Sequence, residues 1–350
     1  MSKRTRAAAV SALVLSGLAG LGAVGVVARQ RFLAGDLARV QPGLRAPLLV
    51  LGRGQDGEPG TVRPGNLFQR ASKAQELFTP AGLGTRRMLS TPQGPVSAWL
   101  YETAHRAEQA GSGALVWIHG GGLVGGSPAQ DHALCSRLAT DLGCLVVCVD
   151  YRLAPQHPYP AAIDDCFGAL AWLHENASDL GVDPERLAVG GASAGGGLAA
   201  CVAQRARDAG VPLVFQLLIY PMLDDRTGAG GQEVPGRGEF VWTARSNAQG
   251  WQAYLGHPAG EEETRPWAAA ARCQDLAGLP AAWIGVGDLD LFLDEDLDYA
   301  RRLEQSDVPV TVHVEPGMYH GADFCTWSPQ MRAFRTQAVE ALGSAFRPRP

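Results

Sequence analysis

The stretch Leu187 to Gly197 reads Leu-Ala-Val-Gly-Gly-Ala-Ser-Ala-Gly-Gly-Gly and contains the pattern Gly-x-Ser-x-Gly, with Ser193 at its centre. A short apolar run precedes the pattern and a helical pattern follows it, which predicts a sharp turn between a strand and a helix. Side chains at Gly191 and Gly195 would crowd so tight a turn. The Ser193 hydroxyl is then exposed at the strand end, above the helix amino terminus. The pattern also fits the glycine-rich start of a helix that has no catalytic role. The other motifs have to distinguish between the two interpretations.

A second glycine-rich segment follows Ala114 to Ile118, a continuous apolar run typical of a strand buried on both faces. It reads His119-Gly120-Gly121-Gly122. Backbone N–H groups in a glycine run can approach an oxyanion because no Cβ atoms stand in the way. His119 is expected to hold this loop in shape. The rival interpretation, a phosphate-binding loop, lacks the Lys-Ser/Thr pair that ends such a loop.

The chain around these motifs alternates between strand and helix patterns, after a predicted antiparallel pair at Arg86 to Leu89 and Val96 to Tyr101. The expected strands are 114–118, 144–149, 187–189, 213–219, 281–286 and 310–314, and the expected helices are 134–142, 161–176, 194–209, 294–305 and 330–346. This alternation predicts an α/β fold with a mainly parallel central sheet and helices on both faces. In such sheets ligands bind at the carboxyl ends of the strands, where each motif lies.

A histidine that could activate a serine follows the last predicted strand. His320 comes after the Pro316-Gly317 turn, and in hydrolases of this architecture the histidine is the last of the three groups along the chain. The other histidines precede that position or lie in unrelated segments. A purely structural role for His320 stays open as the alternative.

The acid that orients such a histidine is expected just beyond the preceding strand. There the segment Gly287 to Glu295 offers several carboxylates, of which Asp290 is the preferred candidate and Asp288 its main competitor. Asp294 and Glu295 lie in the first turn of a predicted helix, where the helix dipole favours negative charge without a catalytic role.

The segment Asp224 to Arg272 separates two predicted strands by far more than a usual connection. It has a helical pattern at Thr243 to Leu255 and contains four aromatic residues, namely Trp242, Trp251, Tyr254 and Trp267. We expect a helical cap at about residues 224–272 that lines an apolar pocket, with packing of the aromatic side chains against the protein surface as the alternative.

The amino terminus has the pattern of an export or membrane signal. Lys3, Arg4 and Arg6 precede the uncharged apolar run Ala7 to Val27. This run is long enough to span a bilayer as a helix, which takes about 20 residues. Small residues at Val26 and Ala28 also suit a cleavage site. Residues 1–28 are therefore predicted to be a membrane anchor or a signal peptide, and the protein to be membrane-attached through residues 7–27 or exported.

Length and composition predict a single catalytic domain. The chain has 350 residues, 46% hydrophobic and 19% charged, enough for a large core with an added cap. Residues 29–85 are rich in Gly, Pro and Arg and are expected to form a linker and part of the cap, and residues 86–350 the catalytic domain. A net charge of −5 without a basic patch argues against a nucleic-acid partner. The seven cysteines form no metal-binding spacing and suit core filling, so neither a metal nor an organic cofactor is expected.

In order along the chain, these motifs resemble those of the hormone-sensitive-lipase-like family of α/β-hydrolases, which includes many bacterial esterases and the arylacetamide deacetylases. The resemblance covers Ala114 to the carboxyl terminus and rests on the segments His119–Gly122, Asp150-Tyr-Arg-Leu-Ala-Pro155, Gly191–Gly195, Asp290–Glu295 and His320-Gly321. It implies that Ser193 is the nucleophile, His320 the base and Asp290 the acid. It further implies that the oxyanion donors are the N–H groups of Gly121, Gly122 and Ala194.

The implied function is hydrolysis of a small-molecule ester with a short or medium acyl chain through an acyl-enzyme. Leu123, Trp242 and Ala322 are expected to line the substrate pocket. The family usually has a bulky aromatic residue where Ala322 stands, so extra volume is expected there. An amide hydrolase or deacetylase with the same groups stays open, as does a ligand-binding receptor, although such receptors lack the histidine that this chain has at His320.

The sequence departs from the family pattern at two further positions. The family usually has Asp or Thr where Ala192 stands and Glu where Gln156 stands. Neither change removes a catalytic group, so these departures bear on substrate choice. Asp150 and Arg152 are expected to be structural.

Overall fold

The computed structural model describes residues 34–45, 84–107 and 111–347. The predicted anchor or signal segment, residues 1–28, lies outside the described residues, as do residues 29–33 and 46–83 of the predicted linker. No helix in the described ranges is both long enough and apolar enough to cross a bilayer.

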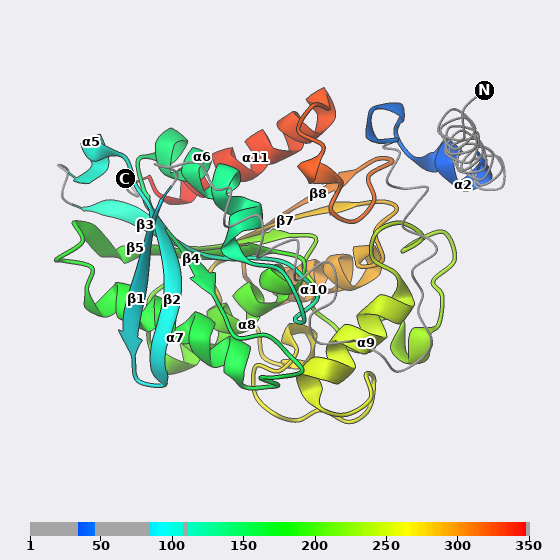
Figure 1. Ribbon diagram of the computed structural model, residues 1–350, viewed down its shortest axis with the longest axis horizontal. Helices are drawn as coiled ribbons and strands as arrows, with labels where there is room; N and C mark the ends of the chain where they lie inside the picture. Colours follow the sequence, from blue (N-terminus) through cyan, green and yellow to red (C-terminus); the bar gives the residue numbers. More distant parts are fainter. Residues whose placement is uncertain (1–33, 46–83, 108–110, 348–350) are drawn as a thin grey trace, which may run out of the picture.

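Eight strands form one sheet in the order β1-β2-β4-β3-β5-β6-β7-β8 (Figure 1). The strands are β1 Thr85–Thr91, β2 Gly94–Tyr101, β3 Ser112–Ile118, β4 Leu145–Asp150, β5 Val182–Ala192, β6 Phe215–Ile219, β7 Ala281–Gly287 and β8 Val310–Glu315. Strand β2 pairs antiparallel with β1 and β4, and all other neighbours are parallel. This is the mainly parallel sheet that the alternating sequence patterns predict.

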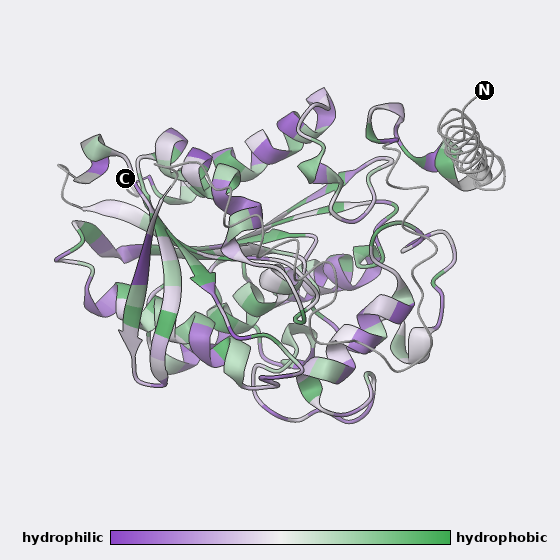
Figure 2. Ribbon diagram, viewed as in Figure 1, coloured by the Kyte–Doolittle hydropathy of each residue, from purple (hydrophilic) through white to green (hydrophobic). Residues whose placement is uncertain are grey.

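Helices cover both faces of the sheet (Figure 1). One face carries α6 His132–Leu142 and α11 Pro329–Ala345, and the other carries α7 Ala161–Glu175, α8 Ala194–Ala209 and α10 Leu293–Gln305. Figure 2 shows hydrophobic and hydrophilic residues alternating along these helices, as expected for helices that lie between a sheet and solvent. The fold is the α/β-hydrolase fold.

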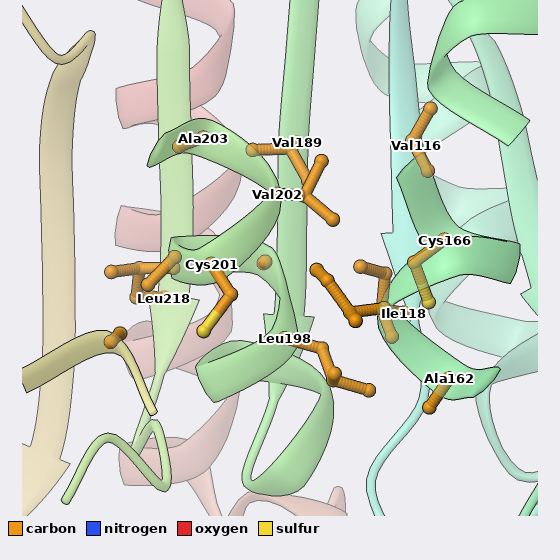
Figure 3. Close-up of a cluster of buried hydrophobic side chains, with 14 of the residues drawn as sticks. Val116, Ile118, Ala162, Cys166, Val189, Leu198, Cys201, Val202, Ala203 and Leu218 are labelled. Atoms are coloured by element: carbon orange, nitrogen blue, oxygen red, sulfur yellow. The ribbon is translucent and has the colours of Figure 1, made fainter. Parts of the chain in front are cut away.

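One hydrophobic core cluster lies between α8 and the central strands, and another lies on the face of the sheet covered by α6 and α11. Figure 3 shows Leu198, Cys201 and Val202 of α8 packed over Val189 and Leu218 of the sheet. Small side chains on α8, such as Ala199 and Ala203, let the helix approach the strands closely. All seven cysteines are free and six are buried, which agrees with the core-filling role expected for them.

The predicted cap segment forms α9 Ala244–Leu255 and two short 3₁₀ turns, η3 Ala229–Gly231 and η4 Ala270–Arg272. Thr243 caps the start of helix α9, and its side-chain oxygen accepts a hydrogen bond from the N–H of Ser246 at 3.2 Å. The helix ends at Gly256, which has a left-handed backbone conformation. Within residues 224–272 the structure therefore has one α-helix with long connections.

A short amino-terminal segment packs against the catalytic domain. Helix α2 Ala34–Arg39 and the 3₁₀ turn η1 Pro42–Leu44 follow one another, and Val40 and Leu44 are fully buried. The Gln41 N–H donates to the carbonyl of Gly317 at 3.1 Å, in the loop that precedes His320. This part of the predicted linker region is therefore attached to the domain near the candidate site.

Candidate active site

Ser193 lies at the turn between β5 and α8, in a backbone conformation that is rare for a residue with a side chain. Its φ is 57° and its ψ is −124°. Its N–H donates to the Ile219 carbonyl at 2.9 Å and its carbonyl accepts from the Met222 N–H at 2.9 Å, so neighbouring β6 holds the strained turn in place.

The two glycines of the turn are required by close backbone contacts. A Cβ atom at Gly195 would lie 2.0 Å from the Ile118 carbonyl oxygen, and one at Gly191 would lie 2.3 Å from the Gly195 carbonyl oxygen. No side chain fits at such distances, because carbon and oxygen atoms without a bond between them need more than 3 Å. The pattern at this turn therefore has a steric cause.

Three side chains from separate strand ends form one hydrogen-bonded chain. The His320 Nε2 atom lies 2.9 Å from Ser193 Oγ, and His320 Nδ1 lies 2.8 Å from Asp290 Oδ2. Asp290 is fully buried, and Ser193 and His320 are nearly so. The second Asp290 oxygen accepts a hydrogen bond from the Phe292 N–H at 3.0 Å, which fixes the carboxylate. The structure thus brings together the three residues that the sequence analysis selects.

The competing carboxylate, Asp288, has a different partner. Its Oδ1 atom accepts a hydrogen bond from the backbone N–H of Gly317 at 2.7 Å. The geometry therefore assigns Asp288 to the start of the loop that follows β8 and Asp290 to His320.

The loop after β3 turns sharply beside Ser193. Gly121 has φ of 132° and Gly122 has φ of 62°, values that favour glycine. The Gly121 carbonyl accepts hydrogen bonds from the N–H groups of Val124 at 3.2 Å and Gly125 at 2.9 Å, which closes the turn. Within the described residues, the N–H groups of Gly121, Gly122 and Ala194 meet no protein acceptor. They are available to a ligand oxygen.

His119 supports this loop from below and is fully buried. Its Nδ1 atom lies 2.8 Å from the Gly120 carbonyl oxygen, and its ring stacks on Tyr151 with centroids 4.3 Å apart. Burial lowers the pKa of His119 to about 4, so the ring is neutral and Nδ1 donates to the carbonyl. His119 therefore has the structural role that the sequence analysis expects.

Three aromatic rings surround the imidazole of His320. Tyr220 and Phe292 meet it edge to face with centroids 4.8 Å and 5.1 Å away, and Trp242 lies 6.3 Å away. Of these three rings, only Trp242 is predicted from the sequence. Tyr220 directly follows β6, and this place at the carboxyl edge of the sheet is the signal that could have identified it.

Of the three predicted pocket residues, Trp242 lies beside both Gly122 and the imidazole of His320. Its indole lies against Gly122, where a Cβ atom would be 2.1 Å from the ring. Leu123 and Ala322 are buried in hydrophobic clusters, Ala322 completely. The expectation that Ala322 opens space for substrate differs from the structure, because η5 Ala322–Phe324 directs this residue into the core beneath α11.

The other cap aromatics also differ from the pocket-lining expectation. Trp251 and Tyr254 are buried in the core, and the Trp267 indole N–H donates to Asp208 at the end of α8 at 3.0 Å. Trp251 and Tyr254 are therefore core residues rather than surface residues, and Trp267 packs at the end of α8.

Asp150 and Arg152 have structural partners. Arg152 forms an ion pair with Asp165 at 2.8 Å, and Asp150 forms one with Arg86 at 3.2 Å. In the described ranges, no group of three or more His, Cys, Asp or Glu side chains could hold a metal ion.

Comparison with known proteins agrees with this architecture. Residues 115–324 match the family model described as alpha/beta hydrolase fold. The esterase LipI of Mycobacterium tuberculosis is 38% identical over 234 residues, covering 66% of this chain and 72% of the relative. The carboxylesterase NlhH of the same organism is 41% identical over 214 residues, covering 59% of this chain and 65% of the relative. The matches thus span about two thirds of the length of these relatives.

Two solved structures are similar over most of their length. A bacterial heroin esterase superposes with a TM-score of 0.76 at 32% identity, covering 89% of this chain and 99% of that protein. The esterase LipW from Mycobacterium marinum superposes with a TM-score of 0.73 at 32% identity, covering 89% of this chain and 97% of that protein. By its fold, its matched family model and these relatives, the chain belongs to the hormone-sensitive-lipase-like family of α/β-hydrolases and is a hydrolase of the carboxylesterase type.

Proposed function

We propose that this protein hydrolyses carboxylic esters with Ser193 as nucleophile, His320 as general base and Asp290 as the acid that orients the histidine. The observation that carries the proposal is the hydrogen-bonded chain from Ser193 Oγ through both His320 nitrogens to Asp290 Oδ2, at 2.9 Å and 2.8 Å. A serine hydroxyl needs such a partner because it is a weak nucleophile while it holds its proton.

In the first half of the reaction, Ser193 Oγ attacks the ester carbonyl carbon and its proton passes to His320 Nε2. The carbonyl oxygen becomes an oxyanion, which the free N–H groups of Gly121, Gly122 and Ala194 stabilise. His320 then returns the proton to the departing alkoxide, so that the alcohol leaves and the acyl group stays on Ser193. Asp290 keeps the imidazole in the required tautomer and stabilises its positive charge.

In the second half, His320 takes a proton from water, and the hydroxide attacks the acyl carbon. The bond to Ser193 Oγ breaks, Ser193 regains its proton from His320, and the carboxylic acid is released. No metal or cofactor takes part in these steps.

The proposed substrates are small esters with short or medium acyl chains. Trp242 supports this, because its ring lies close to both Gly122 and His320 and so limits the space above the reacting carbonyl. A relative named ethyl acetate hydrolase, from Pseudomonas putida, is 37% identical over 212 residues and adds support for small esters.

The test is replacement of Ser193 by alanine. We expect turnover of a nitrophenyl acetate to be lost while the melting temperature stays close to that of the wild type, because alanine keeps the Cβ atom and removes only the hydroxyl. A fluorophosphonate probe should label the wild type at Ser193 alone. Turnover retained by the variant, or labelling at another serine, would contradict the assignment. A matched nitroanilide tests the amide alternative.

We also propose that residues 7–27 attach the protein to a membrane or direct its export, on the sequence pattern alone. Fractionation of cells that express the full chain, with amino-terminal sequencing of the mature protein, separates a retained anchor from a cleaved signal. Full-length protein in the soluble cytoplasmic fraction would contradict both.

A further inference from the structure

A buried carboxylate lies three residues beyond His320 and is bonded on both of its oxygens. Asp323 is 2% exposed, in the short turn η5 Ala322–Phe324. Its Oδ1 atom accepts a hydrogen bond from the Tyr220 hydroxyl at 2.5 Å. Its Oδ2 atom accepts from Arg335, with Nε at 3.0 Å and the guanidinium Nη2 at 2.9 Å. None of these three residues belongs to the hydrogen-bonded chain proposed for catalysis.

The two partners come from rigid elements on either side of the His320 loop. Tyr220 directly follows β6, and its N–H donates to the Gly285 carbonyl of β7 at 2.6 Å. Arg335 lies in α11, and its side chain is 10% exposed. Asp323 thus connects the loop to both the sheet and a helix.

Tyr220 and Arg335 are in the ionisation states that this arrangement needs. Burial raises the pKa of Tyr220 well above its ordinary value, so the hydroxyl keeps its proton and donates. Burial by itself lowers the pKa of Arg335, but the opposing effect of nearby groups, chiefly the Asp323 carboxylate, is larger. The net pKa is raised, and the guanidinium stays charged. Because a buried charge without its partner is costly, the carboxylate and the guanidinium hold each other in place.

Tyr220 also contacts the imidazole itself. Its ring meets that of His320 edge to face, with centroids 4.8 Å apart, while its hydroxyl is bonded to Asp323. Tyr220 therefore links Asp323 to the imidazole. Gly321, between His320 and η5, has φ of 76° and brings no side chain that could fix the loop. The direction of the imidazole therefore depends on what holds Tyr220 and Asp323.

We propose that Tyr220, Asp323 and Arg335 form a positioning unit that holds the His320 imidazole in line between Ser193 and Asp290. They are positioning residues, since they act through the histidine and touch no reacting atom. The inference rests on the proposed function, because the in-line arrangement matters only if His320 transfers protons during catalysis.

The first test is Tyr220→Phe, which keeps the ring and removes the hydroxyl. We expect kcat on a nitrophenyl ester to fall about 10-fold, with KM within about 2-fold, because substrate contacts stay while the base is less well aligned. The rate of fluorophosphonate labelling should fall by a similar factor, since it depends on the same proton transfer. Arg335→Lys keeps the charge but loses the forked geometry, and should lower kcat in the same way.

Tyr101→Phe is the matched control. The Tyr101 hydroxyl is also buried, and its hydrogen-bond partner is His132 at the start of α6 rather than a residue of the His320 loop. It should lose thermal stability comparably to Tyr220→Phe and keep wild-type kcat.

Three outcomes would overturn the proposal: wild-type kcat and labelling rate in both folded Tyr220→Phe and Arg335→Lys, an equal loss of kcat in Tyr101→Phe, or a rise in KM that accounts for the whole effect. If Tyr220→Phe does not fold, Arg335→Lys decides. Failure of the proposed function looks different, because the wild type would then show no labelling at Ser193.

Discussion

Asp288 and Asp290 lie two residues apart after β7 and hold the two ends of one loop. Asp288 accepts a hydrogen bond from the Gly317 N–H at 2.7 Å, and Asp290 lies 2.8 Å from His320 Nδ1. One carboxylate thus anchors the start of the loop, while the other meets the imidazole at its end.

This relationship predicts unequal effects of two similar substitutions. Asp290→Asn should lower kcat by about four orders of magnitude, because the amide favours the wrong imidazole tautomer and gives no charge support. Asp288→Asn should be much milder, because it weakens only a backbone anchor. Steady-state kinetics on one ester, with melting temperatures as the folding control, measures both. A larger loss of kcat in Asp288→Asn than in Asp290→Asn would show that Asp288, and not Asp290, is the acid.

Asn247 is expected to set the position of Trp242. It is fully buried, accepts the Trp242 indole N–H at 3.1 Å and donates to the Thr227 carbonyl at 2.7 Å. Asn247→Ala should let the indole move, so that kcat/KM for hexanoate esters rises relative to acetate esters. Stability should fall by about 1–3 kcal/mol, because two polar groups lose their partner.

Asn176→Ala is the control for this substitution. The Asn176 side chain also donates to a backbone carbonyl, that of Trp172 at 2.8 Å, at the end of α7. Its chain-length profile should match the wild type. An identical profile for Asn247→Ala would mean that Trp242 keeps its position without Asn247.

Asp296 predicts a specific pH dependence of stability. It is fully buried, and neither carboxylate oxygen has a hydrogen-bond partner among the described residues. Burial, with the nearby charges of Glu295 and Asp290, raises its pKa well above the ordinary value. From about pH 4 upward the unfolded chain loses this proton while the folded protein keeps it, so the free energy of unfolding falls as pH rises.

Asp296→Asn should remove this loss. The melting temperature of the variant relative to wild type should therefore increase between pH 5 and pH 8, whatever the fixed effect of the substitution. Asp298→Asn, at an exposed position of the same helix, should show no such trend. If the difference in melting temperature between Asp296→Asn and the wild type did not change with pH, the Asp296 carboxyl would have to ionise in the folded protein.

Ala322→Phe should destabilise the protein without changing its substrate preference. Ala322 has no exposed surface and lies in the cluster beneath α11. Overpacking of this kind typically costs about 1–3 kcal/mol. Chemical unfolding and a chain-length series measure the two effects. Selective loss of activity on long esters, at unchanged stability, would place the residue in the substrate pocket instead.

Most elements could be predicted from local pattern. Helix α8 is expected and found at Ala194–Ala209, because apolar periodicity and the preceding glycine turn define it locally. Strand β5 is the exception, since it begins at Val182 rather than at the expected Leu187. The intervening Asp-Pro-Glu-Arg resembles a loop, and it forms an irregular bulge between the pairs Ser112–Val182 and Ala114–Leu187 with neighbouring β3.

The sequence by itself determined the chemistry of the candidate site, because each motif is defined by neighbours in the chain. The nucleophile turn needs glycines at fixed positions, and the order of serine, acid and histidine follows from the order of the strands. Only the tertiary structure decided between Asp288 and Asp290 as the acid. It also placed Ala322 in the core and brought Tyr220 to Asp323, which lies 103 residues later in the chain. These outcomes depend on which side chains the sheet order brings to one edge, and this order, with β4 between β2 and β3, is a property of packing between distant segments.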